Sequence, residues 1–145
     1  QGPAGGYTGS IGFAGSTGYS GSLGSTGFTG STGPSKAYSQ LYQPGVLNTT
    51  VGVNRWYTPA NVTINSTVAR VVTAPQGSNT VIYVKKNGTV QSIINITPGS
   101  TSGANNSINI NMSDLTNDYI TVDVATVGYT YPGSDLNVII KYLYI

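Results

Sequence analysis

The sequence has no histidine, no cysteine and no glutamate, and its acidic side chains are four aspartates. General acid–base catalysis usually depends on a histidine, or on a carboxylate held near a second titratable group. A nucleophilic serine needs a base, for which this chain offers lysine alone, and zinc sites need cysteine or histidine. The composition therefore argues against an enzyme and against a zinc protein, and we expect no catalytic residue, no metal and no cofactor.

Charge is also scarce, because six basic residues stand against four acidic ones and leave a net charge of +2. The basic residues are scattered, whereas nucleic-acid-binding proteins usually carry a clustered basic stripe. No apolar run approaches the roughly 18 residues that a membrane-spanning helix needs. We therefore expect neither a nucleic acid nor a membrane as a partner.

The first part of the chain is built on a glycine period of three. Ten glycines keep this spacing without an error: Gly6, Gly9, Gly12, Gly15, Gly18, Gly21, Gly24, Gly27, Gly30 and Gly33. A strict Gly-X-Y period is typical of the collagen triple helix, in which only glycine fits at the crowded axis. The period predicts a stalk or anchor over residues 1–36 with these glycines on its axis. Since the chain opens inside the repeat at Gln1, we expect it to be a portion of a longer protein.

Proline is rare in the repeat, where Pro3 and Pro34 are its two examples. Without proline the polyproline-II conformation is not pre-organised, so ordering the chain costs more entropy. Ten such triplets should need a trimeric head, a partner surface or a longer stalk to hold together. Two alternatives stay open, namely a disordered Gly/Ser linker and a bundle of polyglycine-like helices.

Residues 37–145 have a different pattern, with several runs that alternate between apolar and polar side chains. Ile108, Ile110 and Met112 alternate with asparagines, and the run from Ile120 to Val124 alternates in the same way. This period of two is typical of half-buried strands. A further face is expected to join four aliphatic residues with Ser66 and Arg70 as polar intruders: Val62, Ile64, Val68 and Val72.

Turn signals separate these runs. Asn87-Gly88 lies between two apolar segments, which is the strongest short hairpin signal. About eight strands are expected, over residues 45–47, 52–57, 61–73, 79–86, 89–97, 106–112, 118–126 and 135–145. Closely spaced strands with Gly/Pro turns predict an all-β fold, an antiparallel β-sandwich of the jelly-roll type. Trp56 is expected to anchor its core.

The last predicted strand is apolar on both faces. One face carries Leu136, Val138, Ile140, Tyr142 and Tyr144, and the other carries Ile139, Leu143 and Ile145. A sheet with one solvent-exposed face does not need this second apolar row. We interpret Ile139, Leu143 and Ile145 as a candidate subunit-interface strand, since a triplet stalk independently calls for three chains. The alternative is a central strand that a loop covers.

Two loops are candidates for ligand contact. Tyr129 and Tyr131 lie in a segment flanked by glycine and proline, where exposed tyrosine suits carbohydrate or protein contacts. The polar stretch from Thr97 to Asn106 is the second candidate. Asp114, Asn117 and Asp118 could supply oxygens to calcium, but turn-forming residues explain them equally well.

Two sets of motifs resemble known proteins. Gly6-Tyr7-Thr8-Gly9-Ser10 and Gly27-Phe28-Thr29-Gly30-Ser31 resemble repeats in structural proteins of tailed bacteriophages. Arg55-Trp56-Tyr57-Thr58-Pro59, with the later motifs Val84-Lys85-Lys86-Asn87-Gly88-Thr89 and Pro132-Gly133-Ser134-Asp135-Leu136, resembles a β-sandwich module at the C-terminal end of phage fibre and virion-surface proteins. The resemblance implies a virion protein and brings no catalytic residues with it.

The sequence thus predicts a homotrimeric structural protein on the virion surface, as a head fibre, a capsid decoration or a tail-fibre segment. Its expected partners are copies of itself, other virion proteins and a host surface glycan. A purely structural role without a receptor is a rival hypothesis. A cellular collagen-like surface adhesin or an extracellular filament subunit is another.

Overall fold

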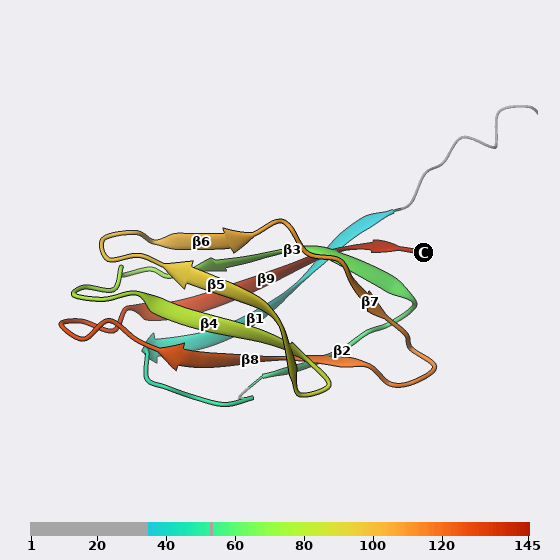
Figure 1. Cartoon of the computed structure of the whole chain (residues 1–145), viewed down its shortest axis with the longest axis horizontal. Coiled ribbons are helices and arrows are strands. Elements are labelled where there is room, and N and C mark those ends of the chain that lie inside the picture. The colour runs from blue at the N-terminus through green and yellow to red at the C-terminus, as the bar shows by residue number, and fades with distance from the viewer. Residues whose placement is uncertain (1–34, 53) are drawn as a thin grey trace, which may run out of the picture. The chain divides into compact units, whose positions relative to one another are not determined.

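The computed structural model describes residues 35–52 and 54–145, which fall into nine strands and no helix (Figure 1). The strands are β1 (Lys36–Val46), β2 (Arg55–Tyr57), β3 (Val62–Arg70), β4 (Thr80–Lys86), β5 (Thr89–Ile96), β6 (Ser102–Asn105), β7 (Ile110–Met112), β8 (Tyr119–Thr126) and β9 (Ser134–Tyr144). The chain divides into two units, 1–33 and 34–145, and the described residues belong to the second. The predicted stalk, with its glycines from Gly6 to Gly33, lies outside the described residues.

The strands pair as a set of nested antiparallel hairpins. The first strand pairs with the last (β1 with β9), β2 pairs with β8, β3 pairs with both β6 and β7, and β4 pairs with β5. Pairing of β3 with β9 and of β4 with β8 then joins these hairpins into two sheets, ordered β1-β9-β3-β6 (with β7 beside β3) and β2-β8-β4-β5. With β6 and β7 taken as one interrupted strand, this is the strand order of a jelly roll. The predicted all-β antiparallel class is confirmed.

Alternation along the strands places one aliphatic row of each sheet in a common core. Ile64 and Ile140 come from the five-stranded sheet and Ile82 and Ile120 from the four-stranded sheet, and all four are fully buried. Burying such a side chain contributes about 1.5–3 kcal/mol. Trp56 packs against this core beside Tyr142, at 5.2 Å between ring centroids, which agrees with its expected anchoring role. The two sheets therefore enclose one core, as in a β-sandwich.

One polar pair lies inside this core. The hydroxyl groups of Thr67 on β3 and Ser92 on β5 are 2.9 Å apart, and the two residues are 0% and 2% exposed. Because β3 and β5 belong to different sheets, this hydrogen bond links the sheets across the interior. Each hydroxyl satisfies the other, which removes the cost of burying them alone.

The predicted face of the third strand was wrong beyond Ile64. The register of β3 against β9 shifts between Ile64 and Ser66, so one extra residue is inserted there. A one-residue shift moves every later side chain to the opposite face. Ala69 is therefore buried, whereas the predicted core residue Val72 is 73% exposed.

Two strand assignments were also wrong. The first strand covers Lys36–Val46, not 45–47, and its polar residues hide the alternation. The predicted ligand loop from Thr97 to Asn106 contains β6, which pairs with β3 from Ser102 to Asn105. Residues 97–101 and Asn106 of this stretch lie outside the strand.

Candidate functional site

The described chain begins and ends at the same end of the sandwich, so its other end is a separate surface (Figure 1). The start of β1, the turn between β4 and β5 and the loop between β7 and β8 lie at the first end. The loops from β3 to β4, from β5 to β6 and from β8 to β9 lie at the opposite end. We call this second surface, formed by residues 71–79, 97–101 and 127–133, the loop end.

Backbone hydrogen bonds hold the loop end together. Gln76 donates to the Tyr131 carbonyl at 2.8 Å and accepts from the Thr130 amide at 3.0 Å, which joins two of the loops. Gly99 of the third loop donates to the Pro75 carbonyl at 2.9 Å. Because these backbone N–H and C=O groups are paired between loops, the three loops have one defined arrangement.

The packing of these loops depends on small residues. Gly77 has a φ of +90°, and a Cβ added there would lie 2.5 Å from Thr130 Oγ1 and 2.9 Å from the Thr130 amide nitrogen. A Cβ on Gly128 would overlap the carbonyl oxygens of Tyr131 and Gln76. Glycine is needed at both positions because the two loops approach each other so closely.

The structure separates the two tyrosines of the predicted ligand loop. Tyr129 is 80% exposed, and its backbone amide is held by Ser78 Oγ at 3.2 Å. Tyr131 is half-buried and forms a β-bridge with Gln76. Tyr129 therefore projects from a fixed backbone, whereas Tyr131 belongs to the packing of the loops. Whether either side chain contacts a ligand stays a prediction.

Two of the three candidate interface residues, Ile139 and Leu143, lie on the outer face of the five-stranded sheet, whereas Ile145 follows β9 and lines a hollow with Met112 and Asp118. Ile139 and Leu143 are half-buried between their cross-strand neighbours on β1 and β3, and Ile145 is 73% exposed. Leu143 also lines a surface hollow of about 550 Å³ with Tyr38 and Lys141. Their proposed contact with another subunit stays a prediction.

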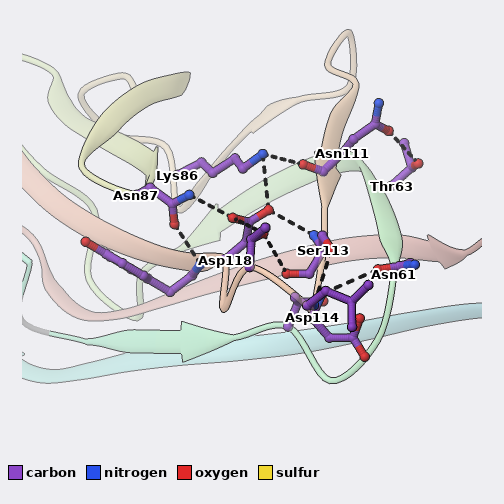
Figure 2. A network of polar contacts seen from close by, with 12 residues as sticks. Asn61, Thr63, Lys86, Asn87, Asn111, Ser113, Asp114 and Asp118 are labelled. Atoms are coloured by element: carbon purple, nitrogen blue, oxygen red, sulfur yellow. Dashed lines mark hydrogen bonds and ion pairs between the residues drawn. The ribbon is translucent and has the colours of Figure 1, made fainter.

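A buried carboxylate organises the opposite end of the sandwich (Figure 2). Asp118 Oδ1 accepts hydrogen bonds from Asn87 Nδ2 at 2.8 Å and Thr116 Oγ1 at 3.0 Å. Its Oδ2 accepts from the Ser113 amide at 2.9 Å and lies 3.3 Å from Lys86 Nζ. Four donors thus converge on one side chain that is 6% exposed.

These donors lower the pKa of Asp118 from 3.8 to about 2, with the Asn87 hydrogen bond as the largest cause and the Ser113 amide as the next. Asn87 also accepts from the Tyr119 amide at 3.0 Å, so the turn between β4 and β5 is fastened to β8. Asn87 adopts a φ of 49°, as the Asn-Gly hairpin turn requires. Asp118 is a structural anchor for this end.

The same geometry bears on the calcium alternative. Both oxygens of Asp118 face donors, whereas a cation would need them as free acceptors. Asp114 is exposed and points away from Asp118 in Figure 2. Within residues 35–52 and 54–145, no group of three or more His, Cys, Asp or Glu side chains is placed to hold a metal ion. The described part of the chain also has no helix long and apolar enough to span a membrane.

Sequence reasoning missed the network around Asp118. Its members come from two separate parts of the chain, residues 86–87 and 113–119, and each one alone looks like an ordinary turn residue. The one available signal was Lys86-Asn87, which places a cation and an amide at a hairpin turn. Nothing in the sequence links that turn to Asp118, because the contact depends on the pairing of β4 with β8.

No family model matches the chain, and no curated protein matches it at a significant level. One solved structure is similar, a chain described as "Cyanophage Pam1 capsid asymmetric unit". It aligns with a TM-score of 0.47 and 12% sequence identity, over 77% of this chain and 85% of that chain. A similarity this low carries no argument about function.

Proposed function

We propose that this chain is a non-enzymatic structural protein of a tailed-phage virion surface, with a trimeric head whose loop end faces outward. The observation that carries the proposal is the loop end itself, at the opposite end of the sandwich from the start of β1. The repeat of residues 6–33 precedes the head in the sequence, and we assign display to the loop end because three loops lie together there. The Gly-X-Y period and the resemblance to phage fibre modules supply the virion context.

The arrangement suits multivalent display. Three copies on one stalk would present three Tyr129 side chains, and linking weak sites can raise avidity by roughly 10²–10⁴ through effective concentration. Tyrosine offers a large contact area at low entropy cost, and its backbone here is already fixed by Ser78 and by the neighbouring loops. Loop preorganisation lowers the cost of binding further.

The location is tested by fractionating purified particles. An antibody against the head should label intact virions of the phage that encodes the chain and should recover it with the capsid or the tail. Recovery with the cell envelope instead would refute the virion assignment and favour the cellular adhesin or filament subunit. Light scattering on the full chain should give three times the mass of one copy, and a monomer would refute the trimer.

Display is tested by competition for host cells. The purified full chain should reduce phage adsorption, and Tyr129→Ser should weaken this inhibition at least tenfold. Leu115→Ser is the matched control, because Leu115 is 84% exposed at the other end of the sandwich. Equal inhibition by the original chain and both variants would exclude Tyr129 as a contact residue. If neither the original chain nor a variant reduces phage adsorption, and virions that lack the protein are less stable, the purely structural role is favoured.

A further inference from the structure

The outer face of the four-stranded sheet carries a cationic site away from the loop end. A hollow of about 270 Å³ lies there, between β2, β4 and β8 and the segment before β2. Its walls include Arg55 of β2, Lys85 of β4 and Tyr119 of β8. Ligand sites usually measure about 300–1,000 Å³, so this hollow has the size for a single small unit of a larger ligand.

Arg55 is held in place without a carboxylate partner. Its Cζ lies 4.2 Å from the centroid of the Tyr119 ring, and its Nη1 donates to Tyr57 Oη at 3.3 Å. Both salt bridges in the described part of the chain involve other residues. A guanidinium has five N–H donors in a fixed fork that matches an anionic oxygen pair. Among the described residues Tyr57 takes one of these donors, which leaves most of them for a ligand in an orientation set by two tyrosines.

The charges of Lys85 and Asp123 in the hollow cancel, so Arg55 determines the net charge of the hollow. Asp123 is 4% exposed, forms an ion pair with Lys85, and accepts from the Gly52 amide at 2.8 Å. Both of its oxygens are thus engaged by this chain. Two cations and one anion leave a local charge of +1, which attracts an anion.

An aromatic surface lies beside the guanidinium. Tyr57 is 53% exposed, and its ring centroid is 5.6 Å from that of Tyr119. An exposed tyrosine offers an apolar ring and a polar hydroxyl together, which suits the apolar face and the hydroxyl groups of a sugar. The Arg55 guanidinium beside the Tyr57 ring therefore suits a sugar that carries an acidic group.

We propose that Arg55, Tyr57 and Tyr119 form a binding site for an acidic unit of a polysaccharide, with the carboxylate or sulfate on the Arg55 fork and the sugar ring on Tyr57. The proposal rests on the proposed function, since it names the class of host glycan for a surface-displayed head. It places this contact on the side of the sandwich, separate from Tyr129.

The test is calorimetric titration of the full chain with oligogalacturonate, sulfated dextran oligomers and neutral galactose oligomers. At least one of the acidic probes should bind at least tenfold more tightly than the neutral one, and the stronger of the two identifies the acidic group. Arg55→Gln should weaken binding at least tenfold, because a charge-assisted hydrogen bond is lost. Tyr57→Phe keeps the ring but removes the hydroxyl that holds the guanidinium, and should weaken binding about two- to fivefold.

Arg70→Gln is the matched control, since it removes the same charge from an exposed strand residue on the other sheet. It should leave binding within twofold. Equal losses for Arg55→Gln and Arg70→Gln, equal affinity for the neutral oligomer, or equal affinity for polyglutamate would overturn the proposal. Thermal unfolding of Arg55→Gln, expected to match the original chain, excludes misfolding as the cause. Because this assay uses no virion, failure here leaves the virion assignment to its own test.

Discussion

Replacing Asp118 by asparagine should show how much of the head's stability depends on one carboxylate. The side chain keeps its shape, but its amide group must face donors, either Asn87 Nδ2 or the Ser113 amide. Hydrogen bonds to a charged group contribute about 1.5–3 kcal/mol, and a buried donor left unpaired costs about 1–3 kcal/mol. We expect Asp118→Asn to lower the free energy of unfolding by about 2–4 kcal/mol.

Asp114→Asn is the matched control. It removes the same charge from the same loop, at an exposed side chain that accepts no hydrogen bond within the described residues. Its effect should stay within about 0.5 kcal/mol. Thermal unfolding of the full chain, at one protein concentration throughout, should separate the two variants by roughly 8–16 °C at about 4 °C per kcal/mol.

The pH dependence tests whether charge is the cause. The pKa of Asp118 is lowered in the folded protein from 3.8 to about 2. A lowered pKa means that the stabilisation is present above about pH 4 and is lost as pH falls toward 2. The difference between the original chain and Asp118→Asn should therefore shrink over this window. Equal unfolding temperatures for Asp118→Asn and Asp114→Asn, or a difference that does not change between pH 5 and pH 2, would refute the reasoning.

Two further perturbations test the packing. Gly77→Ala should destabilise the head by at least about 2 kcal/mol in denaturant unfolding, because its Cβ would overlap Thr130 in addition to the positive φ. Gly99→Ala, with a φ of +82° and open space around it, should cost only about 1 kcal/mol, and equal costs would exclude the overlap. Thr67→Val should cost about 1–3 kcal/mol by leaving Ser92 unpaired in the core, and adding Ser92→Ala should recover part of it. A double variant as unstable as the sum of the single ones would contradict this pairing.

The sequence predicts the strands in which apolar and polar side chains alternate regularly. Ile110 and Met112 are buried and Asn111 is exposed, as the alternation indicates, and Ile120 to Val124 keeps its apolar row in the core. In both strands the apolar row faces the core between the two sheets. Strand β8 is also covered on its other face, where Thr121 and Asp123 are buried, and the alternation did not indicate this. The all-β class follows from this pattern alone.

The failures have local physical causes. In β3 an inserted residue reverses the face after Ile64, and alternation does not reveal the insertion because the residues that follow, Asn65, Ser66 and Thr67, are all polar. Strand β1 is an edge strand with Pro44 and Gly45 near its end, residues that normally indicate a turn. Strand β6 has the sequence Ser-Gly-Ala-Asn, with no β-forming residue, and exists because β3 supplies its partner.

The contacts of the charged side chains could not be predicted from the sequence, because most of them join residues that lie far apart in the chain. Asp118 anchors one end of the sandwich, and Asp123 pairs with Lys85 on the outer face of the four-stranded sheet. Asp135 accepts a hydrogen bond from the Gly45 amide at 2.9 Å. That amide lowers the pKa of Asp135 as the largest cause. Three of the four aspartates are thus committed to the fold of the described residues.

This use of the aspartates determines what the surface can attract. Since Lys85 and Lys86 are engaged by Asp123 and Asp118, the basic side chains outside these ion pairs in the described residues are Lys36, Arg55, Arg70 and Lys141. Exposed charges more than about 8 Å apart are largely screened at physiological salt, so their net sign steers ligands weakly and local geometry decides where an anion binds. Among these four, Arg55 is the one that the described structure holds over an aromatic ring. A surface with so few charges can therefore still discriminate among glycans, provided that the cation is preorganised and the surrounding polar side chains are neutral.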